Sequence, residues 1–212
     1  MLFSRVQNLL IVCVEFCAAI PIERFARLHC GDLQVVDERS RFWPGRDAFE
    51  AAKIPEDVRI VAFVRHPWER FIASIRGNEE LLDRRLSFLA ESKSAPYLTA
   101  DRVAGTELPC CPDQVLIGGD SVPRMRGIAE TIRNVESFFT GRTADLVRLD
   151  NGPEPIGTIA PFVGKRLPNI GADVGSWDSL RMAADALHTT DREQLLRDTF
   201  PADYTELGFS PY

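Results

Sequence analysis

"RIVAFVRHPWERFIAS", residues 59–74, joins an apolar, β-branched run to a stretch with helical periodicity. The run Arg59–Val64 is apolar at every position after the first, which is typical of a parallel strand buried between helices. Pro67 has the backbone φ of a first helical turn and keeps His66 out of helical geometry. We therefore predict a strand that ends at Val64 and a helix that follows over residues 67–75.

Arg65 stands at the junction of this strand and this helix. Open α/β sheets bind their ligands at the carboxyl ends of the strands. The N-terminus of a helix also favours anions, because its free N–H groups and its dipole point toward the ligand. We therefore expect Arg65 to bind an anion at the edge of the sheet. The alternative is a structural arginine that pairs with a nearby carboxylate.

Strand-like and helix-like runs alternate along the chain, which predicts a parallel sheet covered on both faces. With 212 residues, 45% apolar and 26% charged, the chain fits a single α/β domain over residues 1–212. The net charge of −6 argues against a general nucleic-acid-binding surface, so we expect no nucleic-acid partner. The expected strands are 9–14, 33–36, 59–64, 115–117 and 146–149, and the expected helices are 22–28, 46–53, 67–75, 79–91, 124–139 and 177–187.

The apolar stretch "NLLIVCVEFCAAIPI", residues 8–22, is a candidate for a signal peptide or a membrane anchor. Glu15 interrupts it, and it is too short to span a bilayer, so a first core strand and no transmembrane segment are expected. The five cysteines are an odd number and do not form a disulfide framework. We expect reduced thiols, a cytoplasmic location and no metal site, although Cys13 with Cys17 and the adjacent Cys110 and Cys111 offer a metal-site alternative.

Four motifs in this chain resemble those of the PAPS-dependent sulfotransferases, especially the carbohydrate and bacterial members. "FVRHPWERFIAS", residues 63–74, resembles the 3′-phosphate-binding segment of that family. The other three are "LVRLDN" at 146–151, "RLPNIG" at 166–171 and "FPADYTELGF" at 200–209. The resemblance implies a P-loop-like three-layer fold with a central, mostly parallel sheet flanked by helices. It also implies PAPS as the donor, no metal, and a small-molecule or glycan acceptor that presents a hydroxyl or an amine.

The first loop of the chain departs from the family pattern. The family's first loop typically holds the 5′-phosphosulfate with a Lys and a Thr-Ser pair. In this chain Phe16 stands at the expected lysine, and Ile20 and Pro21 stand at the Thr-Ser pair. Backbone N–H groups at a helix start can still hold an anion, so we expect donor binding by Cys17, Ala18, Ala19 and Ile20. Arg24, one turn into the predicted helix, is the candidate replacement for the missing cation.

The second half of the expected donor site is also modified. The family's phosphate-binding serine follows the arginine by eight residues, where this chain has Ala73, with Ser74 one residue later. One residue rotates a helical side chain by about 100°, so Ser74 binds the phosphate only if the helix begins one residue differently. Arg70 is expected to be structural. Lys165 and Arg166 either close over the 3′-phosphate or form a solvated basic pair.

An acceptor hydroxyl needs a catalytic base, for which His66 is the candidate nearest to Arg65. A capping or packing histidine is the alternative reading, and a carboxylate from residues 79–91 is another possible base. The loop over residues 92–112 is expected to select the acceptor. Three functions therefore stay open: a sulfotransferase, a weak or inactive binding protein of the same fold, and a histidine phosphatase suggested by "VRHPWER", residues 64–70.

Overall fold

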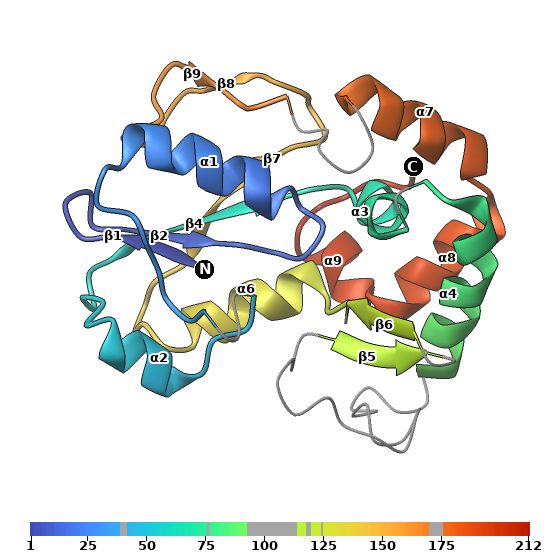
Figure 1. The fold of residues 1–212 in the computed structure, drawn as a ribbon, viewed down its shortest axis with the longest axis horizontal. Helices are drawn as coiled ribbons and strands as arrows, with labels where there is room; N and C mark the ends of the chain where they lie inside the picture. The colour runs from blue at the N-terminus through green and yellow to red at the C-terminus, as the bar shows by residue number, and fades with distance from the viewer. Residues whose placement is uncertain (39–41, 76, 93–113, 118–119, 124, 170–175) are drawn as a thin grey trace.

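A computed structural model of residues 1–212 describes the whole chain except residues 39–41, 76, 93–113, 118–119, 124 and 170–175 (Figure 1). The strands are β1 (Leu2–Ser4), β2 (Leu9–Val12), β3 (Gln34–Val35), β4 (Arg59–Val64), β5 (Gln114–Ile117), β6 (Asp120–Pro123), β7 (Ala144–Arg148), β8 (Pro155–Ile156) and β9 (Lys165–Arg166). The helices are α1 (Ala19–His29), α2 (Arg46–Ala51), α3 (Pro67–Ser74), α4 (Glu79–Ser92), α6 (Ile128–Glu136), α7 (Trp177–Leu187), α8 (Thr190–Thr199) and α9 (Pro201–Thr205).

The central sheet has the strand order β3-β1-β2-β4-β7. Strands β2, β4 and β7 are parallel, with Leu10 opposite Ile60 and Ile60 opposite Ala144. Strand β1 is antiparallel to both of its neighbours, so the sheet is mixed. The prediction that the first core strand and β4 are neighbours is confirmed. The loops that follow β2 and β4 therefore open on the same edge of the sheet.

Helices cover both faces of this sheet (Figure 1). Helix α1 lies over one face, and α2 and α6 lie over the other. Every residue of β2 is buried, as is every residue of β4 after Arg59. This burial on both faces is the reason that both strands are apolar along their whole length.

A second apolar cluster lies beyond the carboxyl edge of the sheet. It joins α3, α4, α7 and α8 through buried side chains that include Trp68, Phe71, Leu82, Leu180 and Leu196. Trp68 also donates a hydrogen bond from Nε1 to the carbonyl of Ala184 in α7, over 2.9 Å. Helix α3 is thereby held against α7.

Several expected elements differ from those observed. The run 115–117 was expected in the parallel sheet but belongs to a separate antiparallel hairpin of β5 and β6. The run at 33–36 pairs antiparallel with β1, a strand that the sequence analysis did not predict. Of the expected acceptor loop, residues 93–112 lie outside the described residues. Within the described part of the chain, no helix is long and apolar enough to cross a membrane.

Candidate anion-binding site at the carboxyl edge of the sheet

The loop between β2 and α1 is a tight turn held in an unusual backbone conformation. Phe16 and Ala18 have φ values of 59° and 58°, in the left-handed region. A side chain at such a φ costs roughly 1–2 kcal/mol per residue relative to ordinary backbone. Non-glycine residues held in this region cluster at ligand-binding loops, where the surrounding structure enforces the strain. The loop is therefore a candidate binding loop on its backbone geometry alone.

Helix α1 begins with free backbone donors. Its first helical hydrogen bond runs from Ile22 N to Ala18 O over 2.9 Å, so the N–H groups of Ala19 and Ile20 have no acceptor within the helix. Pro21 has no N–H group, and no side chain caps the helix. Of the four expected backbone donors, Cys17 already donates to Val14 O at 3.1 Å and is not available to a ligand through its own N–H.

Arg65 lies directly across from this loop, at the end of β4. Its side chain is buried, with 3% of its surface exposed, and its guanidinium lies 5.3 Å from the centre of the Trp177 ring. Its Nε is buried and has no hydrogen-bond partner among the described residues. Within that part of the chain, no carboxylate oxygen lies within 4.0 Å of the guanidinium. Among the described residues, Arg65 is therefore not the directly paired structural arginine of the alternative prediction.

Cys17 holds the loop against Arg65. Its buried thiol accepts a hydrogen bond from the backbone N–H of Arg65. Burial raises the pKa of the Cys17 thiol to about 11, so the thiol stays protonated at neutral pH. Cys17 is thus a packing residue of the binding loop and has no thiolate to offer as a nucleophile or metal ligand. No group of three or more metal-binding side chains occurs in the described ranges.

Glu69, in the first turn of α3, is a residue near Arg65 that the sequence did not single out. It is buried, its Oε1 lies 3.7 Å from Arg181 Nε, and its Oε2 has no hydrogen-bond partner in the described parts of the chain. Burial raises the pKa of the Glu69 carboxyl, against the opposing effects of Arg65 and Arg181. Arg65 precedes helix α3, so the spacing of four residues does not by itself place the two side chains on one side, and the sequence carries no clear signal for Glu69.

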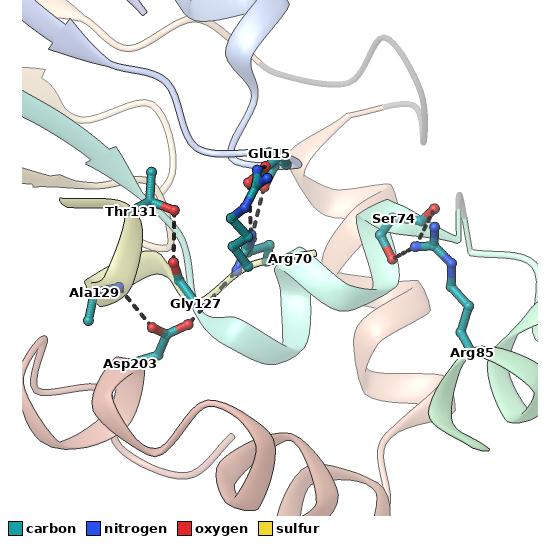
Figure 2. Close-up of polar contacts among 9 residues, drawn as sticks. Glu15, Arg70, Ser74, Arg85, Gly127, Ala129, Thr131 and Asp203 are labelled. Atoms are coloured by element: carbon teal, nitrogen blue, oxygen red, sulfur yellow. Dashed lines mark hydrogen bonds and ion pairs between the residues drawn. The ribbon is translucent and has the colours of Figure 1, made fainter. Parts of the chain in front are cut away.

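Arg70 has the structural role that the sequence predicted (Figure 2). Its Nε donates to the backbone carbonyl of Glu15 over 2.8 Å, and its Nη2 lies 3.3 Å from the Glu15 carboxylate. Its Nη1 lies 3.9 Å from Asp203, whose other carboxylate oxygen accepts a hydrogen bond from Ala129 N at the start of α6. One buried arginine therefore connects the first loop, α3, α6 and α9.

Ser74 faces α4. Its hydroxyl donates to Phe71 O over 2.6 Å. The same hydroxyl accepts a hydrogen bond from Arg85 Nη1, as Figure 2 shows. Helix α3 begins at Pro67 as expected, and with that start Ser74 is turned away from the position of the family's serine. The condition that the sequence set for Ser74 as a phosphate ligand is therefore not met.

Arg85 is a cation that the sequence did not identify as a site residue. Its guanidinium lies 5.8 Å from the centre of the Phe16 ring, and burial lowers its pKa to about 10. Phe16 occupies the place of the family's loop lysine. Arg24, the replacement that the sequence suggested, is exposed on α1. The structure thus places a different cation, from α4, beside the first loop.

His66 uses both ring nitrogens within the fold. Nδ1 accepts a hydrogen bond from Trp68 N over 3.1 Å, which caps α3, and Nε2 lies 2.8 Å from the carbonyl of Ser210, which can only accept. Burial lowers the pKa of His66 and favours the neutral ring. The geometry corresponds to the capping alternative and leaves no ring nitrogen for an acceptor hydroxyl or for a phosphohistidine. The assignment of His66 as catalytic base has no geometric support.

The other expected site residues lie further out. Lys165 and Arg166 form β9, which pairs with β8, and both are exposed, as expected of a solvated basic pair. In the "LVRLDN" segment Arg148 pairs with Asp150 at 2.9 Å and stacks on Phe209 of the "FPADYTELGF" segment at 4.1 Å. Two of the family-like motifs are therefore in contact.

Comparisons with protein-family models, with curated proteins and with solved structures found no match to this chain.

Proposed function

We propose that this protein binds the nucleotide PAPS at the carboxyl edge of its sheet and transfers the sulfuryl group to a hydroxyl or an amine of a glycan or another small acceptor. The observation that carries the proposal is Arg65, a buried cation that lies near Cys17 of the strained loop and whose Nε has no hydrogen-bond partner in the described residues. A buried polar atom without a partner costs about 1–3 kcal/mol. Such an atom in a native fold calls for an explanation, and a bound anion is the explanation that supports this proposal.

The proposal assigns the two ends of the donor to two parts of this edge. Arg65 binds the 3′-phosphate, in keeping with the resemblance of residues 63–74 to the 3′-phosphate-binding segment of the sulfotransferases. The N–H groups of Ala19 and Ile20, at the start of α1, bind the 5′-phosphosulfate through the helix dipole and the free donors. Arg70 is a positioning residue, since it holds the first loop through Glu15 without facing the ligand.

Sulfuryl transfer places developing negative charge on the oxygen that leaves the donor, so a cation near that oxygen accelerates the reaction. Arg85 is the proposed cation because it lies against Phe16, at the place of the family's lysine. Loss of one preorganised charge of this kind typically costs about a hundred- to a thousandfold in rate. Arg85→Gln is therefore expected to slow transfer while PAP, the desulfated product, still binds.

The alternative function is a nucleotide-binding protein of the same fold with little or no turnover. Phe16, Ile20 and Pro21 favour it, because they remove the side chains with which the family holds the 5′-phosphosulfate. The two functions share the Arg65 site and differ only in the chemical step.

The experiment that separates them follows labelled sulfate from PAPS onto a panel of glycans. Wild type, Arg85→Gln and the triple variant Phe16→Lys, Ile20→Thr, Pro21→Ser are compared. A wild-type rate that falls in Arg85→Gln supports the enzyme with its own cation. No wild-type transfer, with transfer gained in the triple variant, supports the binding protein. No transfer by any of the three and no binding of PAP would contradict both functions.

A further inference from the structure

Arg65 and Glu69 share a feature that the proposed contact of Arg65 with a phosphate does not account for. Both side chains are 3% exposed, and each has one buried polar atom with no hydrogen-bond partner in the described residues. The two unpaired atoms are Nε of Arg65 and Oε2 of Glu69. Each residue affects the pKa of the other, yet their charged atoms stay more than 4.0 Å apart. The pair is close enough to share one ligand and too far apart for a direct ion pair.

The charges around Glu69 do not by themselves keep its carboxyl group ionised. Positive charge faces it from Arg65 at the end of β4 and from Arg181 on α7. Negative charge faces it from Asp150, after β7, and from Asp185 on α7, and the phenol of Tyr212 also lies within electrostatic reach. Burial is the largest influence, and it raises the pKa of the Glu69 carboxyl.

A phosphate bound to Arg65 changes this balance further. A phosphate monoester carries about −1.5 to −2 charges at pH 7. Placed beside a buried carboxylate it would be repelled, and like charge favours the protonated carboxyl. A protonated carboxyl is a hydrogen-bond donor, whereas a carboxylate only accepts. The same residue that opposes an anion when ionised therefore binds it when protonated.

We propose that Glu69 is a second ligand of the phosphate that Arg65 binds, and that it donates a hydrogen bond from its protonated carboxyl to a phosphate oxygen. Binding then takes up one proton from solvent onto Glu69, and no covalent bond changes. This inference rests on the proposed function, because it needs a phosphate at Arg65. It makes nucleotide affinity depend on pH, with tighter binding in mild acid.

The test is calorimetric titration with PAP in pairs of buffers that differ in their ionisation enthalpy, which counts the protons taken up. The titrations run between about pH 7 and about pH 8, above the second pKa of a phosphate monoester, near 6. For the wild type we expect uptake approaching about one proton per PAP, and affinity that falls by up to about tenfold per pH unit as pH rises. Glu69→Gln keeps a hydrogen-bond donor of similar shape but cannot titrate. Its binding of PAP should therefore show only the proton uptake and the pH dependence that come from the phosphates of PAP. Glu50→Gln, an exposed change on α2, is the matched control and should behave as wild type.

Equal proton uptake and equal pH dependence in wild type and Glu69→Gln would overturn the inference and leave the proposed function standing. Absence of PAP binding by the wild type would overturn both. Infrared difference spectra of the unmodified protein give a second readout that needs no variant. Addition of PAP should produce the carbonyl band of a newly protonated carboxyl, and its absence while PAP binds would also refute the role of Glu69.

Discussion

Arg70 donates its Nε hydrogen to the backbone carbonyl of Glu15 over 2.8 Å, and both side chains are almost completely buried. The contact joins the first turns of α3 to the strained loop after β2. It also gives the buried Glu15, in the loop that follows an apolar core strand, a cationic partner.

Replacing Arg70 by Met should destabilise the fold strongly. The change leaves the Asp203 carboxylate buried without Arg70. It also removes one of the arginines that pair with Glu15, another of which is Arg126. Breaking a buried pair typically costs about 3–5 kcal/mol. Urea unfolding measures the loss. Arg133→Met removes an arginine that is 57% exposed and pairs with Glu206, so it should change the free energy of unfolding by less than about 1 kcal/mol. Equal effects of the two changes would show that Arg70 is not the hub described above.

Replacing Arg65 by Met should have the opposite effect on stability. Arg65 is a buried cation with no directly paired carboxylate among the described residues, so an apolar side chain of similar length removes a desolvation penalty. We expect the free energy of unfolding to stay level or to rise, as is common when a strained functional group is removed. A loss of about 2 kcal/mol or more, the size expected of a disrupted core, would mean that Arg65 has a structural role.

The left-handed backbone at Ala18 predicts a stabilising glycine. Ala18→Gly relieves a φ of 58°, and we expect a gain of about 0.5–1 kcal/mol after the entropy of the glycine is counted. Ala186→Gly, on an exposed position of α7, is the control and should lose about 1 kcal/mol. Thermal unfolding of both variants shows whether each change raises or lowers the stability of the fold. A loss at both positions would argue against the loop conformation.

Acid should weaken the fold partly through His66. Burial holds the pKa of His66 below its usual value, so the unfolded chain binds a proton at a higher pH than the folded chain does. The stability contributed by the neutral ring is therefore present above about pH 6.5 and is lost as pH falls from there through the folded pKa. His66→Asn cannot titrate, so urea unfolding near pH 7 and near pH 5 should show a smaller acid loss for the variant. The same acid loss in both proteins would exclude this role.

Much of the central sheet followed from the sequence. Runs such as Leu9–Val12 and Arg59–Val64 are apolar on both faces, so the two strands and their position next to each other in the sheet were predictable. Pro67 marks the start of α3, so the position of Arg65 between strand and helix was predictable too. The short strand β1 was not, because its three residues give no periodicity to recognise. Residues 115–117 were misplaced because a brief apolar run looks the same in a sheet and in a hairpin.

The site was less predictable than the fold. The roles of Ser74 and His66 depend on which hydrogen bonds their side chains make, and those bonds go to Phe71, Arg85, Trp68 and Ser210. Arg85 reaches Phe16 from another helix, and only the packing of α4 brings the two together. Glu69 lies in the first turn of α3 and Arg65 precedes that helix, so the proximity of Glu69 to Arg65 required the structure. The burial of Glu69, and the absence of a partner for its Oε2 among the described residues, required it as well.

The central claim, that Arg65 binds the 3′-phosphate of a nucleotide, is tested most directly by calorimetry with PAP and with AMP, which lacks that phosphate. The wild type should bind PAP more tightly than AMP by about 2–3 kcal/mol, the size of a charge-assisted contact between an arginine and a phosphate. Arg65→Met should bind the two nucleotides with nearly equal affinity. A wild type that binds no PAP, or an Arg65→Met variant that keeps the full preference for PAP over AMP, would contradict the account.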